Sequence, residues 1–272
     1  MMDPVDPTTY VRQLQTRLQT RWLGRQIEFR QSVGSTNALA LERISASATP
    51  AALHGALVVA DEQLAGRGQR GRSWHSPPGM SIYASAILFA PSAVPPPLLV
   101  AAVALGIAEG LEQATGVSIG IKWPNDLWIG ERKVAGILME RRGAAADAGI
   151  VVGFGINVHH DTVDFPEDLR GLATSLAAHA SGLRRADLLV AVLLRLEQRL
   201  DAVFASSGQS ELEAAYRARS VLLGRRVRLF DADAPIEGVV FDLSATSGLL
   251  LQMDSGPPRH VRAEYAREVR IA

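Results

Sequence analysis

The chain has 272 residues, and its 28 lysine and arginine residues are balanced by 28 aspartate and glutamate residues. This neutral balance argues against a nucleic-acid partner, because non-specific binding to nucleic acid needs a basic surface. The chain has no cysteine, which excludes disulfides, thiolate metal sites and cysteine nucleophiles. The N-terminus carries Asp3 and Asp6 instead of an apolar run, and the longest apolar run, residues 98–108, is too short to span a membrane. We therefore expect a soluble, cytoplasmic protein.

The first 220 residues alternate between short strand-like and longer helix-like segments. One helix is expected within residues 1–24, where Thr8 or Thr9 can cap the first turn. Apolar spacing predicts the remaining elements, and the turn Gly130-Glu131 predicts a β-hairpin. The predicted strands are 27–30, 57–60, 80–89, 119–123, 127–129, 134–140 and 150–158, and the predicted helices are 38–44, 98–114, 172–179, 187–204 and 211–220.

The pattern changes after Gly224 to short strands separated by turns. The expected strands are 227–230, 236–242, 249–253 and 260–262. Regular spacing of this kind predicts a small β-barrel. We therefore expect an α+β protein of two domains: a mixed or antiparallel sheet packed with helices in residues 1–220, and a small barrel in residues 221–272.

A glycine loop rich in arginine occupies residues 66–72, with the sequence Gly-Arg-Gly-Gln-Arg-Gly-Arg. Glycine lets backbone N–H groups approach an anion, and arginine supplies forked donors that match phosphate or carboxylate. No acidic residue occurs between Glu62 and Glu109, so the local charge is positive. The glycine spacing also fits a dinucleotide fingerprint, but the two prolines that follow disfavour the required helix, and the ribose-binding acid is missing. The loop predicts a site for a small anionic ligand.

A second polar segment, residues 122–138, joins Lys-Trp-Pro-Asn-Asp to Lys-Val-Ala-Gly-Ile-Leu. Asn125 and Asp126 follow a proline and form a turn signal, so local turn hydrogen bonds explain them as well as a function does. Lys133 begins a predicted strand, where a lysine is ordinarily exposed and inert. It becomes a functional candidate because Asp126 faces it and Gly136 leaves room for a ligand.

Three further features concern the predicted sheet. Residues 34–37, Gly-Ser-Thr-Asn, precede a helix and supply candidates for its N-cap. Gly153 and Gly155 interrupt a predicted strand, which is typical of a close approach by another backbone or a ligand. His159 and His160 follow at the end of that strand. Because adjacent strand residues point to opposite faces, these two histidines cannot easily bind one metal ion, and we expect both to lie on the surface.

Together these motifs resemble those of the biotin protein ligases and, more distantly, the lipoate ligases. In that family an arginine–glycine loop folds over an acyl-adenylate, and Lys-Trp-Pro-Asn-Asp precedes a Lys-x-Ala-Gly-Ile strand. The resemblance covers residues 25–270 and implies a catalytic domain of the class II synthetase type, followed by an SH3-like domain. Bifunctional members carry an N-terminal winged-helix domain, for which this chain has no room. A short, non-regulatory form is therefore expected.

The resemblance also implies the chemistry. ATP, with Mg²⁺, activates biotin to biotinyl-AMP, and biotin then passes to a lysine of a biotin carboxyl carrier protein, such as a subunit of acetyl-CoA carboxylase. The protein would be a monomer or a homodimer.

The resemblance assigns roles to the site residues as well. Lys133 would hold carboxyl and phosphate oxygens, Asp126 would orient or deprotonate the incoming amine, and Arg67 would assist them. The residues expected at biotin are Ser35, Thr36, Asn37, Gln63, Arg67, Gly68, Gln69, Lys133 and Gly136, and those expected at ATP are Arg70, Arg72, Trp74, Asn125, Asp126 and Asn157. Metal ligands are left unassigned.

One position departs from the family pattern. Gln69 stands where relatives have an arginine that helps to retain the adenylate, so we expect faster leakage of this intermediate.

Three other functions were weighed against this resemblance. A lipoate or octanoate ligase would need a linear acyl pocket, whereas Gln63 and the complete arginine loop favour biotin. A non-catalytic regulator that binds biotin or adenylate is disfavoured by the intact Lys133 and Asp126. An RNA-binding protein would interleave aromatic with basic residues, but only Trp74 adjoins the loop.

Overall fold

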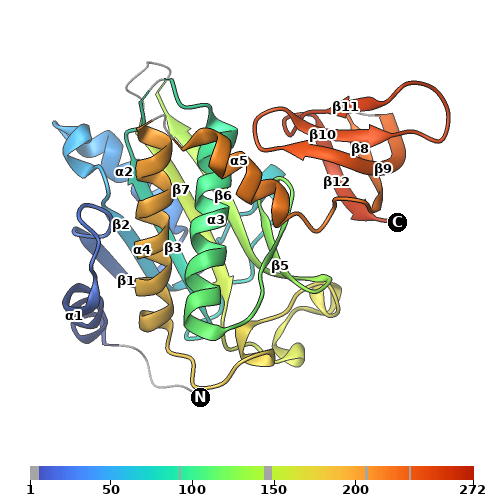
Figure 1. Ribbon diagram of the computed structural model, residues 1–272. Helices are drawn as coiled ribbons and strands as arrows, with labels where there is room; N and C mark the ends of the chain where they lie inside the picture. The colour runs from blue at the N-terminus through green and yellow to red at the C-terminus, as the bar shows by residue number, and fades with distance from the viewer. Residues whose placement is uncertain (1–5, 92, 144–148, 206–207, 233) are drawn as a thin grey trace.

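The computed structural model describes residues 6–91, 93–143, 149–205, 208–232 and 234–272. Its larger part is a seven-stranded sheet with the strand order β1-β2-β3-β7-β6-β5-β4 (Figure 1). β1 and β2 are parallel and the other neighbouring strands are antiparallel, so the predicted mixed sheet is confirmed. The strands are β1 (Ile27–Val33), β2 (Leu57–Gln63), β3 (Ser81–Leu88), β4 (Gly120–Lys122), β5 (Asp126–Ile129), β6 (Arg132–Arg142) and β7 (Gly149–Asn157).

Two long helices, α3 (Pro96–Thr115) and α4 (Arg185–Phe204), cover one face of this sheet (Figure 1). They pack closely because α3 has glycines at the contact. A Cβ atom on Gly106 would lie 2.6 Å from the backbone of Leu196, and one on Gly110 would lie 2.5 Å from that of Val192. By length and composition α3 could cross a membrane, but 67% of its most apolar window is buried inside the protein. It therefore serves as the core helix of the fold.

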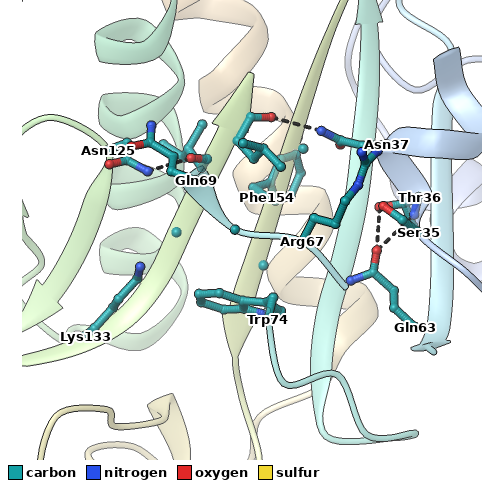
Figure 2. Close-up of a pocket in the computed structure, with 16 residues that line it drawn as sticks. Ser35, Thr36, Asn37, Gln63, Arg67, Gln69, Trp74, Asn125, Lys133 and Phe154 are labelled. Atoms are coloured by element: carbon teal, nitrogen blue, oxygen red, sulfur yellow. Dashed lines mark hydrogen bonds between the residues drawn. The ribbon is translucent and has the colours of Figure 1, made fainter. Parts of the chain in front are cut away.

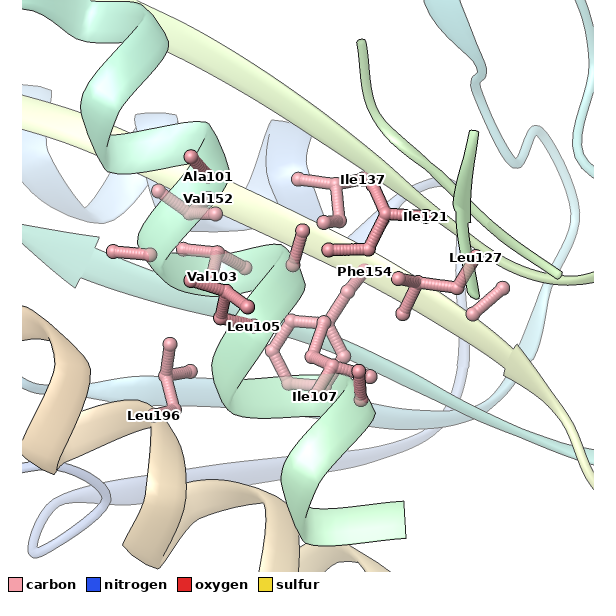
Figure 3. Packing of buried hydrophobic residues seen from close by; sticks show 14 of the residues in the cluster. Ala101, Val103, Leu105, Ile107, Ile121, Leu127, Ile137, Val152, Phe154 and Leu196 are labelled. Atoms are coloured by element: carbon pink, nitrogen blue, oxygen red, sulfur yellow. The ribbon is translucent and has the colours of Figure 1, made fainter. Parts of the chain in front are cut away.

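The strands divide their side chains between two different environments. Phe154 of β7 points toward α3, where it joins Val103, Leu105 and Ile107 in the main core (Figure 3). Alternate residues of a strand face opposite sides, so Gly153 and Gly155 lie on the other face. That face is partly covered by α2 (Thr36–Ala46), which packs on Val58, Ile87 and Val151. Beyond α2 the glycines leave bare backbone, and this is where a ligand can approach.

The N-terminal helix α1 (Pro7–Arg17) is capped by Asp6, which accepts from Thr9 N at 2.7 Å. The predicted caps Thr8 and Thr9 are therefore wrong, because Pro7 takes the first helical position and the cap is the residue before it, Asp6. Residues 1–5 of the predicted segment lie outside the described residues. The chain after α1 is attached to α4 by Glu197, whose carboxylate accepts from the backbone N–H groups of residues 21–23 at 2.7–2.8 Å.

The predicted helix at 172–179 is also wrong. Only a short 3₁₀ turn, η5 (Leu176–Ala178), forms there. The preceding residues run extended beside β6, since Lys133 N donates to Leu172 O and Thr174 N donates to Lys133 O, both at 2.9 Å. These backbone bonds to β6 replace the bonds that a helix would make.

After α5 (Gln209–Ala218) the chain forms a five-stranded antiparallel sheet with the order β11-β10-β9-β8-β12. Four of its strands match the predicted segments, and the fifth, β12, was not predicted. Glu213 of α5 fastens the sheet to the larger part, because its carboxylate accepts from Ser244 Oγ and from Ala245 N. The strands are β8 (Arg226–Asp231), β9 (Ala234–Ser244), β10 (Gly248–Gln252), β11 (Arg259–Val261) and β12 (Ala266–Ile271).

Candidate active site

A pocket opens over the glycine-bearing face of β6 and β7, beneath the loop that follows β2. The empty space in it, together with the open solvent at its mouth, is about 450 Å³. Lys133 and Gln63 lie at opposite sides of the pocket, with Trp74 between them (Figure 2). The lining residues are Ser35, Thr36, Asn37, Gln63, Arg67, Gly68, Gln69, Trp74, Asn125, Lys133, Gly136, Ile137, Leu138, Gly153, Phe154 and Gly155.

Three glycines form the floor of this pocket. A Cβ atom on Gly155 would lie 2.5 Å from the indole of Trp74, and one on Gly136 would lie 3.0 Å from it. A Cβ atom on Gly153 would lie 2.0 Å from Asn37 Oδ1. Real Cβ atoms do not tolerate contacts this short, so only glycine fits at Gly153 and Gly155. A close approach is present, but the approaching groups are the side chains of Trp74 and Asn37, whereas the sequence predicted another backbone or a ligand.

One end of the pocket is polar and is built around the start of α2. Ser35 is the N-cap residue but makes no side-chain cap bond. Gln63 Oε1 takes over that role, because it accepts from Thr36 N at 2.9 Å and from Thr36 Oγ1 at 3.1 Å. Gln63 Nε2 in turn donates to Ser76 Oγ at 3.0 Å. Sequence reasoning missed Ser76, and nothing in its local pattern marks it.

The arginine loop folds back on itself over the pocket. Trp74 N donates to Gly66 O at 2.9 Å, and Gly68 N donates to Arg72 O at 2.7 Å. Residues Gln69–Gly71 form a single 3₁₀ turn, so the α-helix required by a dinucleotide fingerprint is absent from this described segment. Arg67 lines the pocket. Arg70, at a positive φ of 60°, leaves it and donates to Ala263 O, in the connection between β11 and β12, at 3.3 Å.

The other end of the pocket holds a charged pair. Lys133 Nζ lies 2.7 Å from Asp126 Oδ1 and 5.1 Å from the centre of the Trp74 ring. Both side chains are partly exposed, which leaves room for an incoming group. The β5–β6 hairpin brings them together because its register places Asp126 opposite Gly136, three residues beyond Lys133. The predicted proximity of this lysine and this acid is therefore confirmed.

Further cations surround this charged end. Burial lowers the pKa of Lys122, and the nearby carboxylate of Asp126 partly opposes this effect. Three neighbouring cations lower the same pKa further: Lys133, Arg72 and Arg270. Burial likewise lowers the pKa of Arg70, with added repulsion from Arg267 and Arg72. Arg267 and Arg270 belong to β12, so the C-terminal sheet contributes to the positive region. Such a region suits a ligand with several negative charges.

Sequence comparisons place these features in a known family. A sequence model described as the "Biotin/lipoate A/B protein ligase family" matches residues 30–157. The bifunctional ligase/repressor BirA of Bacillus spizizenii is 32% identical over 260 residues, which cover 93% of this chain and 76% of that protein. The chain belongs to the biotin/lipoate A/B protein ligase family. Another member, the biotin–[acetyl-CoA-carboxylase] ligase of Mycobacterium tuberculosis, is 32% identical over 240 residues, or 84% of each chain.

Solved structures of the family agree with the fold. The biotin protein ligase from Aquifex aeolicus in complex with biotin and ATP has a TM-score of 0.77 and 28% sequence identity to this chain. The match covers 91% of this chain and 100% of that one. It supports the catalytic fold of a biotin ligase, with a helix-packed mixed sheet and a second, antiparallel sheet.

Some of the predicted site residues lie away from the lining of the pocket. Asn125 lines it, but its Nδ2 donates to Ile137 O of β6 at 2.7 Å, 12 residues along the chain. Asn157 is buried and donates to Thr174 O at 3.0 Å. The predicted residues outside the lining are Arg70, Arg72, Asp126 and Asn157, of which Asp126 reaches it through Lys133.

The prediction of a surface His160 is wrong. Its side chain is 2% exposed, stacks on Phe165 at 4.6 Å and approaches Ser81. The loop after β7 folds over this ring, which the strand pattern alone did not indicate. Burial, with a smaller contribution from His75, lowers the pKa of His160 to about 4. Within the described ranges, no group of three or more histidine or acidic residues could hold a metal ion.

Proposed function

We propose that this protein is a biotin protein ligase, which activates biotin with ATP and transfers it to a lysine of a carrier protein. The observation that carries this proposal is the arrangement of the pocket: a hydrogen-bonding end at Gln63 and Thr36 and a cationic end at Lys133, across a floor of glycines. The polar end suits the ureido ring of biotin, and the cationic end suits its carboxylate. The names of the relatives, and the biotin and ATP in the Aquifex structure, support the same assignment.

The first step joins two anions, which the site must attract together. A carboxylate oxygen of biotin attacks the α-phosphorus of ATP, the bond to the β-phosphate oxygen breaks, and pyrophosphate leaves with the electron pair. Lys133 and Arg67 line the pocket and would offset the repulsion. The loop that carries Arg67 would also exclude water, which otherwise hydrolyses the mixed anhydride.

The second step needs a neutral amine. The lysine of the carrier attacks the carbonyl of biotinyl-AMP, the amide bond forms and AMP leaves. Asp126 is the carboxylate paired with Lys133, so we assign it to orient the amine and take its proton. Asn125, Trp74, Arg70 and Arg72 are assigned to the nucleotide because they lie on or beside the loop and the cationic end.

Mg²⁺ is assigned as part of the substrate and not as a resident ion. Magnesium is usually held by substrate phosphates with one or two carboxylates. The described residues offer no cluster of three acidic or histidine ligands, whereas Asp126 lies at the cationic end. This donor set fits the entry of Mg²⁺ with ATP.

The remaining assignments concern organisation and partners. We place the domain boundary between residues 1–220 and 221–272, in the connection between α5 and β8, and assign the antiparallel sheet to an SH3-like barrel. The carrier is proposed to be a subunit of acetyl-CoA carboxylase or a similar carboxylase, which the names of the relatives support. We propose a cytoplasmic protein that is a monomer or a homodimer.

ATP–pyrophosphate exchange with biotin, lipoate and octanoate in parallel tests the proposal. Exchange with biotin alone is expected. Exchange with lipoate or octanoate would retain the adenylation but replace the substrate. Biotin binding by a folded protein without any exchange would contradict the proposal and indicate a regulator instead.

A further inference from the structure

Glu140 of β6 adjoins the pocket but has no part in the chemistry described above. It follows Gly136 and Leu138 at alternate positions, so it lies on the same face of the strand. Its side chain is 25% exposed. One carboxylate oxygen, Oε2, accepts from Asn37 Nδ2 at 2.8 Å and from Arg67 Nη2 at 3.3 Å. A single atom therefore joins the start of α2 to the arginine loop.

The amide of Asn37 is almost fully used by the protein. An asparagine amide has two N–H donors and an oxygen with two lone pairs. Both donors are taken, one by Glu140 Oε2 and the other by Leu138 O at 3.1 Å. The oxygen lies 2.6 Å from Ser85 Oγ, which donates to it, and the whole side chain is 3% exposed above Gly153.

Glu140 determines which way this amide faces. With the amide reversed, its oxygen would meet a carboxylate and a backbone carbonyl, and neither of these can donate a hydrogen bond. The observed orientation leaves one capacity for a ligand, the second lone pair of Asn37 Oδ1. Asn37 can therefore accept an N–H from a ligand, but it has no donor left for a ligand carbonyl.

We propose that Glu140 is a positioning residue for the head group of the substrate. It fixes Asn37 as an acceptor for a ligand N–H, and it holds Arg67 of the loop on the same oxygen. This inference rests on the proposed function, in which the head group is the ureido ring of biotin and its N–H groups are the donors. Glu140 contacts neither the carboxylate of biotin nor ATP in this assignment, so it acts on biotin affinity through Asn37 and on adenylation only indirectly, through Arg67.

The first test is Glu140→Gln, which keeps the size but adds donors and removes the charge. The Asn37 amide can then reverse, and the bond from Arg67 weakens. We expect KM for biotin in pyrophosphate exchange to rise about tenfold, because the acceptor for a ligand N–H is no longer held in place, while kcat falls by a smaller factor through the weakened bond to Arg67. Binding of biotin, measured by calorimetry without ATP, is expected to weaken by the same factor.

A second test moves the carboxylate from residue 140 to residue 37, in order to separate a positioning role of Glu140 from general structural support. Asn37→Asp alone places two carboxylates 2.8 Å apart and is expected to lose biotin binding. In Asn37→Asp combined with Glu140→Gln, the new amide donates to the new carboxylate and an acceptor again faces the ligand. We expect the double variant to recover biotin affinity by at least tenfold over Asn37→Asp. If Glu140 only supported the fold, the single and double variants would differ in folding, measured by circular dichroism, and the folded fraction of each would bind biotin equally well.

The matched control is Glu131→Gln, on the β5–β6 turn, where the carboxylate is 73% exposed and pairs with Arg225. It is expected to leave KM and kcat unchanged, and circular dichroism checks the folding of every variant. An unchanged KM in Glu140→Gln, a fall in kcat alone, or no recovery in the double variant would overturn this inference. Failure of the wild-type protein to exchange pyrophosphate with biotin would instead overturn the proposed function.

Discussion

Lys133 Nζ and Asp126 Oδ1 lie 2.7 Å apart, so the lysine assigned to the substrate anions is paired with a carboxylate of this chain. A carboxylate or phosphate that binds Lys133 must compete with Asp126 for it. Binding of substrate would then leave Asp126 with a weaker partner, and a carboxylate without a paired cation is the better proton acceptor. The two assigned roles are therefore coupled through one ion pair.

Replacement of the lysine tests this assignment. Lys133→Ala is expected to lower ATP–pyrophosphate exchange with biotin by about 100-fold or more, because a donor aimed at developing charge is lost. The melting temperature is expected to stay close to that of the wild type, since the side chain is partly exposed. Arg195→Ala, on the outer surface of α4, is the control and should retain full exchange. Unchanged exchange in Lys133→Ala would remove the lysine from the mechanism.

Gln69 lines the pocket at the position where the family resemblance implies an arginine. Gln69→Arg is expected to slow the release of preformed biotinyl-AMP roughly tenfold, because a charge-assisted hydrogen bond to phosphate is stronger than a neutral one. Rapid separation of the enzyme from the free adenylate at timed intervals measures the release rate. The control is Gln26→Arg, which introduces the same charge at the exposed residue directly before β1 and should not slow release of the adenylate. Equal rates for all three proteins would show that the loop arginine does not retain the intermediate in this chain.

The glycine floor predicts a sharp difference between two substitutions. Gly153→Ala places a methyl group on Asn37, so we expect weaker biotin binding and a loss of about 1–3 kcal/mol in the free energy of unfolding. At Gly34, by contrast, a Cβ atom would meet nothing within 4 Å, and Gly34→Ala should be tolerated. Urea unfolding and biotin calorimetry on both variants measure these effects. Similar behaviour of the two variants would contradict the close contact at Gly153.

The buried side chain of His160 predicts that the free energy of unfolding falls at acidic pH. Its pKa is about 4 in the folded protein and about 6.5 when unfolded, so the unfolded chain binds more protons between these values. Stability is full above pH 6.5 and falls as the pH drops toward 4. At pH 5 the burial of this histidine should lower the free energy of unfolding by on the order of 2 kcal/mol.

The measurement is the loss of unfolding free energy between pH 7.5 and pH 5. In His160→Phe this loss should be smaller than in the wild type, whatever the stability of the variant at neutral pH. A variant with the same loss as the wild type would assign the acid sensitivity to other groups.

The central sheet could be predicted because its strands are short apolar runs with clear ends. β12 escaped prediction, since Arg267, Glu268 and Arg270 break its apolar pattern and these side chains face solvent at the edge of the sheet. The buried position of His160 depends on a loop that folds over it, and strand periodicity carries no information about such loops.

The residues of the candidate site also divide into those that could be predicted from the sequence and those that could not. The proximity of Lys133 and Asp126 could be expected from the hairpin between them. Glu140 and Ser85 could not, because their partners lie 103 and 48 residues away in the chain. One signal did exist: Ser85 interrupts an apolar strand, and a buried hydroxyl requires a hydrogen-bond partner.

The bond from Arg70 to Ala263 spans 193 residues of sequence, from the tip of the arginine loop to the connection before the last strand. During synthesis at about 5–20 residues per second, the loop would leave the ribosome roughly 10–40 s before its partner. A nascent chain can therefore build its biotin pocket before it can anchor the cover of that pocket. The bond between Arg70 and Ala263 can therefore form only after the C-terminal sheet has been synthesised.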